Sequence, residues 1–367
     1  MAIFAMAAAV SLGIGIAVVN GANDISKGIA TLVGTGITDI RRAVLWGSVW
    51  TGAGATSATV LSKAMVQTFG KGLLGSHVHP TIAGALAAIG GAALFVLLAT
   101  YRGMPVSTTH AIIGSMMGVA WVAYGTDGFR WAVLGGKILL PLLLSPLIAG
   151  LTTAILMKVW NAWAPDAECV CAEPTQPVLA NADGVLPVSL IFEVRLSTCT
   201  VPSEERIFLT INHLHWMTSG ATSFARGLND APKIAALVLG TRALSGSSTG
   251  QSVPTFFAVA AGMVLGSIIA GRRVTTVLAC DVVRMIPREG FIANFVTAAL
   301  VGPGAALGLP MSTTHVSAGA IMGISAREKS ANAKVIRNML AAWLVTVPVA
   351  GLLGIAVLVT FRIAGLH

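Results

Sequence analysis

Long runs of apolar residues, nearly free of charged side chains, recur along the whole chain. They lie at 3–19, 43–62, 83–100, 131–157, 254–271, 291–308 and 338–361. Each run is long enough to cross roughly 30 Å of hydrocarbon as an α-helix. The pattern therefore predicts an all-α fold, a polytopic transmembrane helical bundle.

The composition supports a protein that lies in a lipid bilayer. Apolar residues make up 55% of the chain and charged residues only 10%, whereas charged residues are about a quarter of a soluble protein. The first apolar run has no basic residues before it and continues directly into the polar stretch 20–24, unlike a signal peptide. We therefore expect this first run to be retained as a membrane helix.

One hydrophilic stretch divides the chain. Residues 158–206 hold seven acidic side chains against three basic ones. We predict a first transmembrane repeat at 1–157, a hydrophilic acidic connecting loop at 158–206 and a second transmembrane repeat at 207–367. The basic surplus of the remainder lies in short loops, which is ordinary at anionic headgroups, so nucleic acid is not needed as a partner. The four cysteines lack C-x-x-C spacing, and we assign them no metal or disulfide.

Two motifs occur twice at nearly the same offset. Gly-x-Asn-Asp-x-x-Lys at 21–27 returns at 227–233, which is 206 positions later. Pro-x-Ser-Thr-Thr-His at 105–110 returns at 310–315, which is 205 positions later. Such duplication is typical of secondary transporters, whose site lies between the repeats near the membrane midplane. Hydropathy alone leaves open whether the copies are parallel or inverted, and whether 107–124 and 312–326 cross fully or re-enter.

Two carboxylates stand inside otherwise apolar segments, at equivalent places in the two repeats. These residues are Asp24 and Asp230. An intramembrane carboxylate is costly unless partnered, and such residues usually mark ion or proton paths. The alternative is a structural ion pair with Lys27 or Lys233, three residues further along the same helical face.

An asparagine precedes each of these carboxylates. Asn23 and Asn229 place an amide carbonyl beside a carboxylate, which suits a hard cation such as Na⁺, and the nearby glycines allow the helix to unwind and offer backbone oxygens. Alternatively, the carboxylates hold protons. We therefore assign Asp24 and Asp230 to cation coupling, with Asn23 and Asn229 completing a Na⁺ site if the coupling ion is sodium.

The Pro-x-Ser-Thr-Thr-His elements are typical of helix starts. Free backbone N–H groups and the positive end of the helix dipole make a helix start an anion site. The alternative, that the hydroxyl residues only cap a helix, explains one copy better than two at one offset. We expect anion binding by the six hydroxyl residues of these helix starts: Ser107, Thr108, Thr109, Ser312, Thr313 and Thr314. His110 and His315 receive no assigned role.

With these motifs the chain closely resembles the inorganic phosphate transporter (Pit) family, over its whole length except 158–206. The resemblance rests on G-A-N-D at 21–24, G-L-N-D at 227–230, P-V-S-T-T-H and P-M-S-T-T-H. It implies a cation-coupled phosphate permease with two inverted repeats, re-entrant hairpins whose tips hold the S-T-T residues, and a homodimer. It also implies that the Asn-Asp pairs form the central cation and substrate site.

Two residues depart from the family pattern and bear on the substrate. Lys27 stands where many members have a small or amide residue, and Arg226 where a histidine is common. Their positive charge keeps sulfate or another oxyanion open as the alternative substrate.

Other classes of protein fit less well. An enzyme is not expected, because no metal-ligand cluster, nucleophile-base pair or nucleotide-binding motif occurs. No cofactor is expected beyond a coupling Na⁺ or H⁺. A passive anion channel would not need the paired aspartates. The compact chain is compatible with a multi-pass protein of the bacterial inner membrane.

Overall fold

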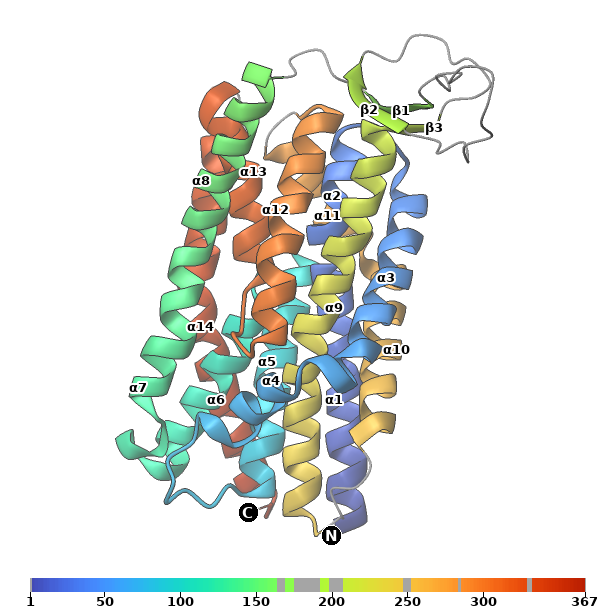
Figure 1. Ribbon diagram of the computed structural model, residues 1–367. Helices are drawn as coiled ribbons and strands as arrows, with labels where there is room; N and C mark the ends of the chain where they lie inside the picture. Colours follow the sequence, from blue (N-terminus) through green and yellow to red (C-terminus); the bar gives the residue numbers. More distant parts are fainter. Residues whose placement is uncertain are drawn as a thin grey trace, which may run out of the picture.

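Helices dominate the chain and follow the same order twice (Figure 1). A computed structural model describes residues 2–163, 169–174, 192–197, 207–246, 252–282, 285–328 and 332–366. The first run comprises α1 (Ala2–Asp24), α2 (Ser26–Gly34), α3 (Ile40–Leu61), α4 (Lys63–Gln67), the π-helical η1 (Thr68–Gly72), α5 (Ile82–Tyr101), α6 (Thr108–Tyr124), the short η2 (Thr126–Gly128), α7 (Trp131–Val133), the π-helical η3 (Leu134–Leu139) and α8 (Leu140–Trp163). The second run comprises α9 (Ile211–Leu244), α10 (Ser252–Ala270), α11 (Arg272–Thr276), the π-helical η4 (Val277–Asp281), α12 (Pro287–Ala306), α13 (Thr313–Glu328) and α14 (Ala333–Ile363).

The predicted helical membrane bundle is confirmed. All seven apolar windows fall on helices, and the stretches left open between crossing and re-entry form α6 and α13. Among the described residues, five helices are long and apolar enough to span a membrane. They are Met6–Gly34, Ile82–Tyr101, Trp131–Trp163, Val253–Ala270 and Ala333–Ile363.

The two runs of helices are oriented differently in the bundle. α1 starts at the bottom of the view in Figure 1 and leads upward to α2, whereas α9 starts at the top beside the strands and descends. The pair α5 and α6 lies in the lower half, and the pair α12 and α13 in the upper half (Figure 1). Re-entry of these two hairpins into a membrane stays a prediction.

Part of the predicted connecting loop is a small sheet that the sequence did not predict. β1 (Cys169–Pro174) lies between β2 (Phe192–Ser197) and β3 (Ile207–Thr210), and both pairings are antiparallel. β3 leads directly into α9, so the sheet sits at the entry to the second run. Helix α8 also extends the first run to Trp163. The other residues of 158–206, Cys199 among them, lie outside the described residues.

Glycines bring the S-T-T helix of each run against the last helix of the other run. A Cβ atom at Gly118 of α6 would meet the backbone oxygen of Gly351 in α14, and one at Gly323 of α13 would meet that of Gly150 in α8. Small residues at such crossings allow close backbone approach, which membrane helices use in place of a hydrophobic driving force. The two runs are therefore interlocked, because each contributes a long helix that supports the other's hairpin.

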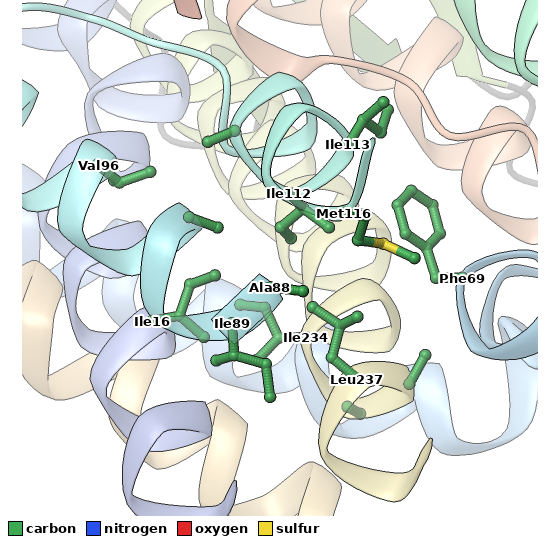
Figure 2. Packing of buried hydrophobic residues seen from close by; sticks show 14 of the residues in the cluster. Ile16, Phe69, Ala88, Ile89, Val96, Ile112, Ile113, Met116, Ile234 and Leu237 are labelled. Atoms are coloured by element: carbon green, nitrogen blue, oxygen red, sulfur yellow. The ribbon is translucent and has the colours of Figure 1, made fainter. Parts of the chain in front are cut away.

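Each hairpin has its own apolar surroundings. The cluster in Figure 2 joins Ile16 of α1, Ile89 of α5, Ile112 of α6 and Ile234 of α9. A second cluster surrounds α12 and α13 and includes residues of α8 and α14. The motif residues are buried as well.

The turns inside the two hairpins use the same backbone conformation. Gly103 follows α5 with φ of 70°, and Gly308 follows α12 with φ of 75°. This left-handed region favours glycine because a Cβ atom would clash there. The chain therefore turns in the same way before each of the two S-T-T segments.

Candidate functional site

The two Gly-x-Asn-Asp motifs sit in different local backbones. The first lies where α1 gives way to α2, as expected from helix unwinding, whereas the second lies inside the unbroken helix α9. The prediction of unwinding is therefore wrong for the second motif. There Pro232 lacks the N–H that would bond the carbonyl of Leu228, and the Ser62 hydroxyl donates to that carbonyl instead, at 3.1 Å. Tertiary contact replaces the missing helical hydrogen bond without breaking the helix.

The two intramembrane carboxylates meet through a single amide. Asn20 Nδ2 donates to Asp24 Oδ2 at 3.0 Å and to Asp230 Oδ2 at 3.2 Å. The Thr108 hydroxyl, from the start of α6, also donates to Asp24 Oδ2, at 3.2 Å. Asp24 and Asp230 are 2% and 3% exposed. The fold therefore joins carboxylates that are 206 positions apart into one buried centre.

Each carboxylate is paired with the lysine three residues along its chain. Lys27 Nζ lies 2.6 Å from Asp24 Oδ1, and Lys233 Nζ lies 3.2 Å from Asp230 Oδ1. Both lysines are 1% exposed. The ion pairs considered as the alternative are thus formed. Because they lie at the point where both repeats meet, they belong to the same centre as the carboxylates.

The motif asparagines fasten the hairpin turns to this centre. Asn23 Nδ2 donates to the hydroxyl of Thr100 at 3.0 Å and to the carbonyl of Met104 at 2.9 Å, both in or just after α5. Asn229 Nδ2 donates to the carbonyl of Met311 at 2.8 Å, just before α13. Each asparagine therefore holds the hairpin of its own repeat beside its own aspartate.

The tips of the two hairpins touch each other. Ser312 Oγ donates to Ser107 Oγ at 2.9 Å, and the Thr314 hydroxyl donates to the carbonyl of Val106 at 2.8 Å. All six hydroxyl residues expected to bind an anion are buried: Ser107, Thr108, Thr109, Ser312, Thr313 and Thr314. The structure thus brings together every residue that the motifs singled out.

Both S-T-T segments start a helix, as predicted. Ser107 and Ser312 each accept a hydrogen bond from the backbone N–H three residues on, at His110 and His315, both at 3.3 Å. The rings of these two histidines are stacked, with centroids 4.6 Å apart. Two helix N-termini, with their partial positive charge, therefore converge on the middle of the bundle.

Two further residues, to which the motifs assigned no role, belong to this centre. Asn20 and Arg226 lie one helical turn before Asp24 and Asp230, at equivalent positions of the repeats. Arg226 is fully buried and donates from Nη2 to the Thr51 hydroxyl at 2.8 Å. Within the part of the chain that the structure describes, its Nε and Nη1 have no hydrogen-bond partner, and neither does Asn20 Oδ1. Buried polar atoms are usually hydrogen-bonded, so these atoms can accept or donate to a ligand or a water. The sequence feature that could have identified both residues is that each lies four positions before the aspartate of its repeat.

Counted in their ionised forms, the basic side chains of the centre exceed the acidic ones by one. Arg226, Lys27 and Lys233 outnumber the two carboxylates, and all five groups are buried. Burying charge is unfavourable unless it is compensated. An anion that enters between the hairpin tips would supply the missing compensation.

Comparison with known proteins shows the family and the fold of the chain. The family described as "Phosphate transporter family" matches residues 20–354. "Inorganic phosphate transporter 2-1, chloroplastic" of Arabidopsis thaliana is 28% identical over 91% of this chain and 68% of its own length. A solved structure titled "The sodium-dependent phosphate transporter" has the same fold, with a TM-score of 0.80 over 98% of this chain and 99% of that one, at 23% identity.

Proposed function

The chain belongs to the phosphate transporter family, and on this premise we propose that it imports inorganic phosphate across a membrane by symport with a cation, either Na⁺ or H⁺. The observation that carries the proposal is the buried polar centre. It combines two helix N-termini, an excess positive charge and two carboxylates within the bundle. A plain anion-binding site would not need the carboxylates, whereas a symporter needs groups that respond to a cation.

We assign phosphate binding to the hydroxyls and amides of the S-T-T helix starts and to the free N–H groups of Arg226. A guanidinium presents several donors in a fixed plane that matches phosphate oxygens. Asp24 and Asp230 would couple binding to the cation, with Asn23 and Asn229 positioning the hairpins. The ion pairs of the two lysines with these aspartates balance the charge of each carboxylate before phosphate binds.

Transport requires the centre to open to each side in turn. The contact between Ser107 and Ser312 and the bond from Thr314 to Val106 close the space between the hairpin tips. Because these are a few hydrogen bonds, each worth about 0.5–1.5 kcal/mol net, an entering anion can replace them. Rocking of one repeat against the other would then expose phosphate to the opposite side.

Phosphate is favoured over sulfate by the unpaired oxygen of Asn20. At neutral pH inorganic phosphate retains at least one proton and sulfate retains none. Asn20 Oδ1 is a buried acceptor without a partner, and a phosphate O–H can donate to it, whereas a sulfate oxygen would face it unpaired. A site that accepts a hydrogen bond from its ligand strongly rejects a ligand of the same shape that lacks the donor, since a buried polar group of the site is then left unpaired.

We therefore expect sulfate to compete poorly for uptake of labelled phosphate into proteoliposomes containing the purified protein. A tenfold excess of sulfate should leave the initial rate nearly unchanged, while unlabelled phosphate or arsenate, which is also protonated, should inhibit it. Inhibition by sulfate as strong as that by phosphate would favour the alternative, a permease for sulfate or another oxyanion.

The remaining assignments are proposals. We place the protein in the bacterial inner membrane as a multi-pass homodimer without enzymatic activity. Cross-linking in native membranes would reveal the dimer.

A further inference from the structure

The ammonium groups of the two buried lysines stand where a coupling Na⁺ would be expected. Lys27 Nζ contacts three oxygens, namely Asp24 Oδ1 at 2.6 Å, Asn23 Oδ1 at 2.8 Å and the Asn23 carbonyl at 3.0 Å. A carboxylate, an amide carbonyl and a backbone carbonyl are the kind of oxygen cage that a hard cation selects. The Asn-Asp pair thus builds a cation site, and a side chain of the same helix turn fills it.

The second repeat shows the same arrangement with different oxygens. Lys233 Nζ contacts the Thr109 hydroxyl at 2.7 Å, the Met311 carbonyl at 2.9 Å and Asp230 Oδ1 at 3.2 Å. An ammonium has three N–H donors and no acceptor. Each lysine therefore has a partner for every donor, so neither has a hydrogen-bonding reason to leave its cage.

Every oxygen of the two carboxylates already accepts at least one hydrogen bond. Asp24 Oδ1 is taken by Lys27, and Asp24 Oδ2 accepts from Asn20 and Thr108. On the other carboxylate, Oδ1 accepts from Lys233 and from the neighbouring amide of Asn229, and Oδ2 accepts from Asn20.

Every contact on both carboxylates is thus an N–H or O–H donor. A Na⁺ ion would have to displace a covalently tethered cation of the same charge from the same oxygens. Asn229 Oδ1 has no hydrogen-bond partner among the described residues, but the carboxylate beside it is paired with Lys233, as Asp24 is with Lys27. A Na⁺ ion at either Asn-Asp pair would therefore compete with an ammonium that is already in place.

We infer that Lys27 and Lys233 serve as built-in cations in place of Na⁺, so that phosphate transport by this chain does not require Na⁺. The inference rests on the proposed transport function and decides between its two coupling ions. It also explains the departure of Lys27 from the family pattern, because a small or amide residue at that position would leave the first cage open to a free cation.

The test compares wild-type protein with Lys27→Ala and Lys233→Ala in proteoliposomes, with NaCl or choline chloride outside at one pH. Wild-type uptake of labelled phosphate should differ less than twofold between the two salts. In either variant, NaCl should raise the rate of phosphate uptake about tenfold or more relative to choline chloride. A tenfold change corresponds to one order of magnitude in occupancy of the open cage by the cation. Lys63→Ala, which removes an exposed lysine of α4, is the matched control and should behave as wild type.

Thermal unfolding of the purified proteins supplies a readout that does not depend on transport. A ligand that binds the folded state raises Tm, so NaCl should raise Tm of Lys27→Ala relative to choline chloride and leave that of the wild type unchanged. If a variant is recovered only when purified in NaCl, that supports the inference. If neither is recovered in either salt, the wild-type salt comparison decides.

Failure of this inference can be distinguished from failure of the proposed transport function. Wild-type uptake that requires Na⁺ would overturn the inference and leave the transport function standing. Absence of phosphate uptake under every gradient would overturn the transport function, and the Tm of Lys27→Ala would still test the cage. A variant that folds but gains no response to Na⁺ in either measurement would also overturn the inference.

Discussion

Asp24→Asn and Asp230→Asn are each expected to lower the initial rate of phosphate uptake by roughly 100-fold or more. Either change removes one of the two negative charges at the centre and leaves a buried lysine without its carboxylate. Removing one partner of a buried ion pair costs about 3–5 kcal/mol, which is about two to four orders of magnitude in an equilibrium. A passive anion channel would keep its flux in both variants, because an anion path gains nothing from the carboxylates.

Loss of folding has to be separated from loss of coupling. The double variant Asp24→Asn with Lys27→Gln removes both charges, so Tm should recover toward the wild-type value while uptake stays low. Asp39→Asn is the matched control, because Asp39 is an exposed carboxylate that caps the start of α3. The backbone N–H groups of Arg42 and Arg41 hold the pKa of Asp39 below its usual value. Near-normal uptake by a folded Asp24→Asn protein would show that this aspartate is not a coupling group.

Arg226→Met is expected to raise the KM for phosphate by roughly 10- to 150-fold with a smaller effect on the maximal rate. The guanidinium is buried beside the carboxylate centre with Nε and Nη1 unpaired, and a hydrogen bond to a charged group contributes about 1.5–3 kcal/mol. The KM of Arg226→Lys should lie between those of the wild type and Arg226→Met, because an ammonium keeps the charge but lacks the planar array of donors. Concentration dependence of the initial uptake rate measures both parameters.

The same helix offers a control for the arginine substitution. Arg242 of α9 donates to the hydroxyl of Thr255 on α10 at 3.1 Å, much as Arg226 donates to Thr51 on α3. Arg242→Met should therefore leave the KM unchanged. An Arg226→Met protein with wild-type KM would show that the unpaired donors do not contact phosphate, and that Arg226 only packs between α9 and α3.

The spacing of apolar residues and the repeated motifs predicted most of the architecture. Seven apolar windows lie on helices, and the two S-T-T segments start α6 and α13. These features are local, because helix starts and apolar runs depend on residues within a few turns. Pairing of α6 with α14 and of α13 with α8 could not be predicted, since a repeat offset does not say which surfaces meet.

The candidate site was predictable by residue type but not by its contacts. Asp24 and Asp230 stood out because an intramembrane carboxylate is costly. Asn20 did not stand out, since its bridge between the two aspartates depends on helices brought together by the fold. Arg226 was ambiguous, because a long cationic side chain beside a membrane helix can also extend to the headgroups.

Gradient-driven accumulation of labelled phosphate in proteoliposomes tests the central claim most directly. Inward Na⁺ and H⁺ gradients are imposed together, and the internal phosphate concentration is followed with and without ionophores that collapse both. A cation symporter raises the internal concentration transiently above the external one, and the ionophores abolish the rise. Equilibration to the external concentration, at a rate that the gradients do not change, would contradict symport and indicate a passive phosphate pathway.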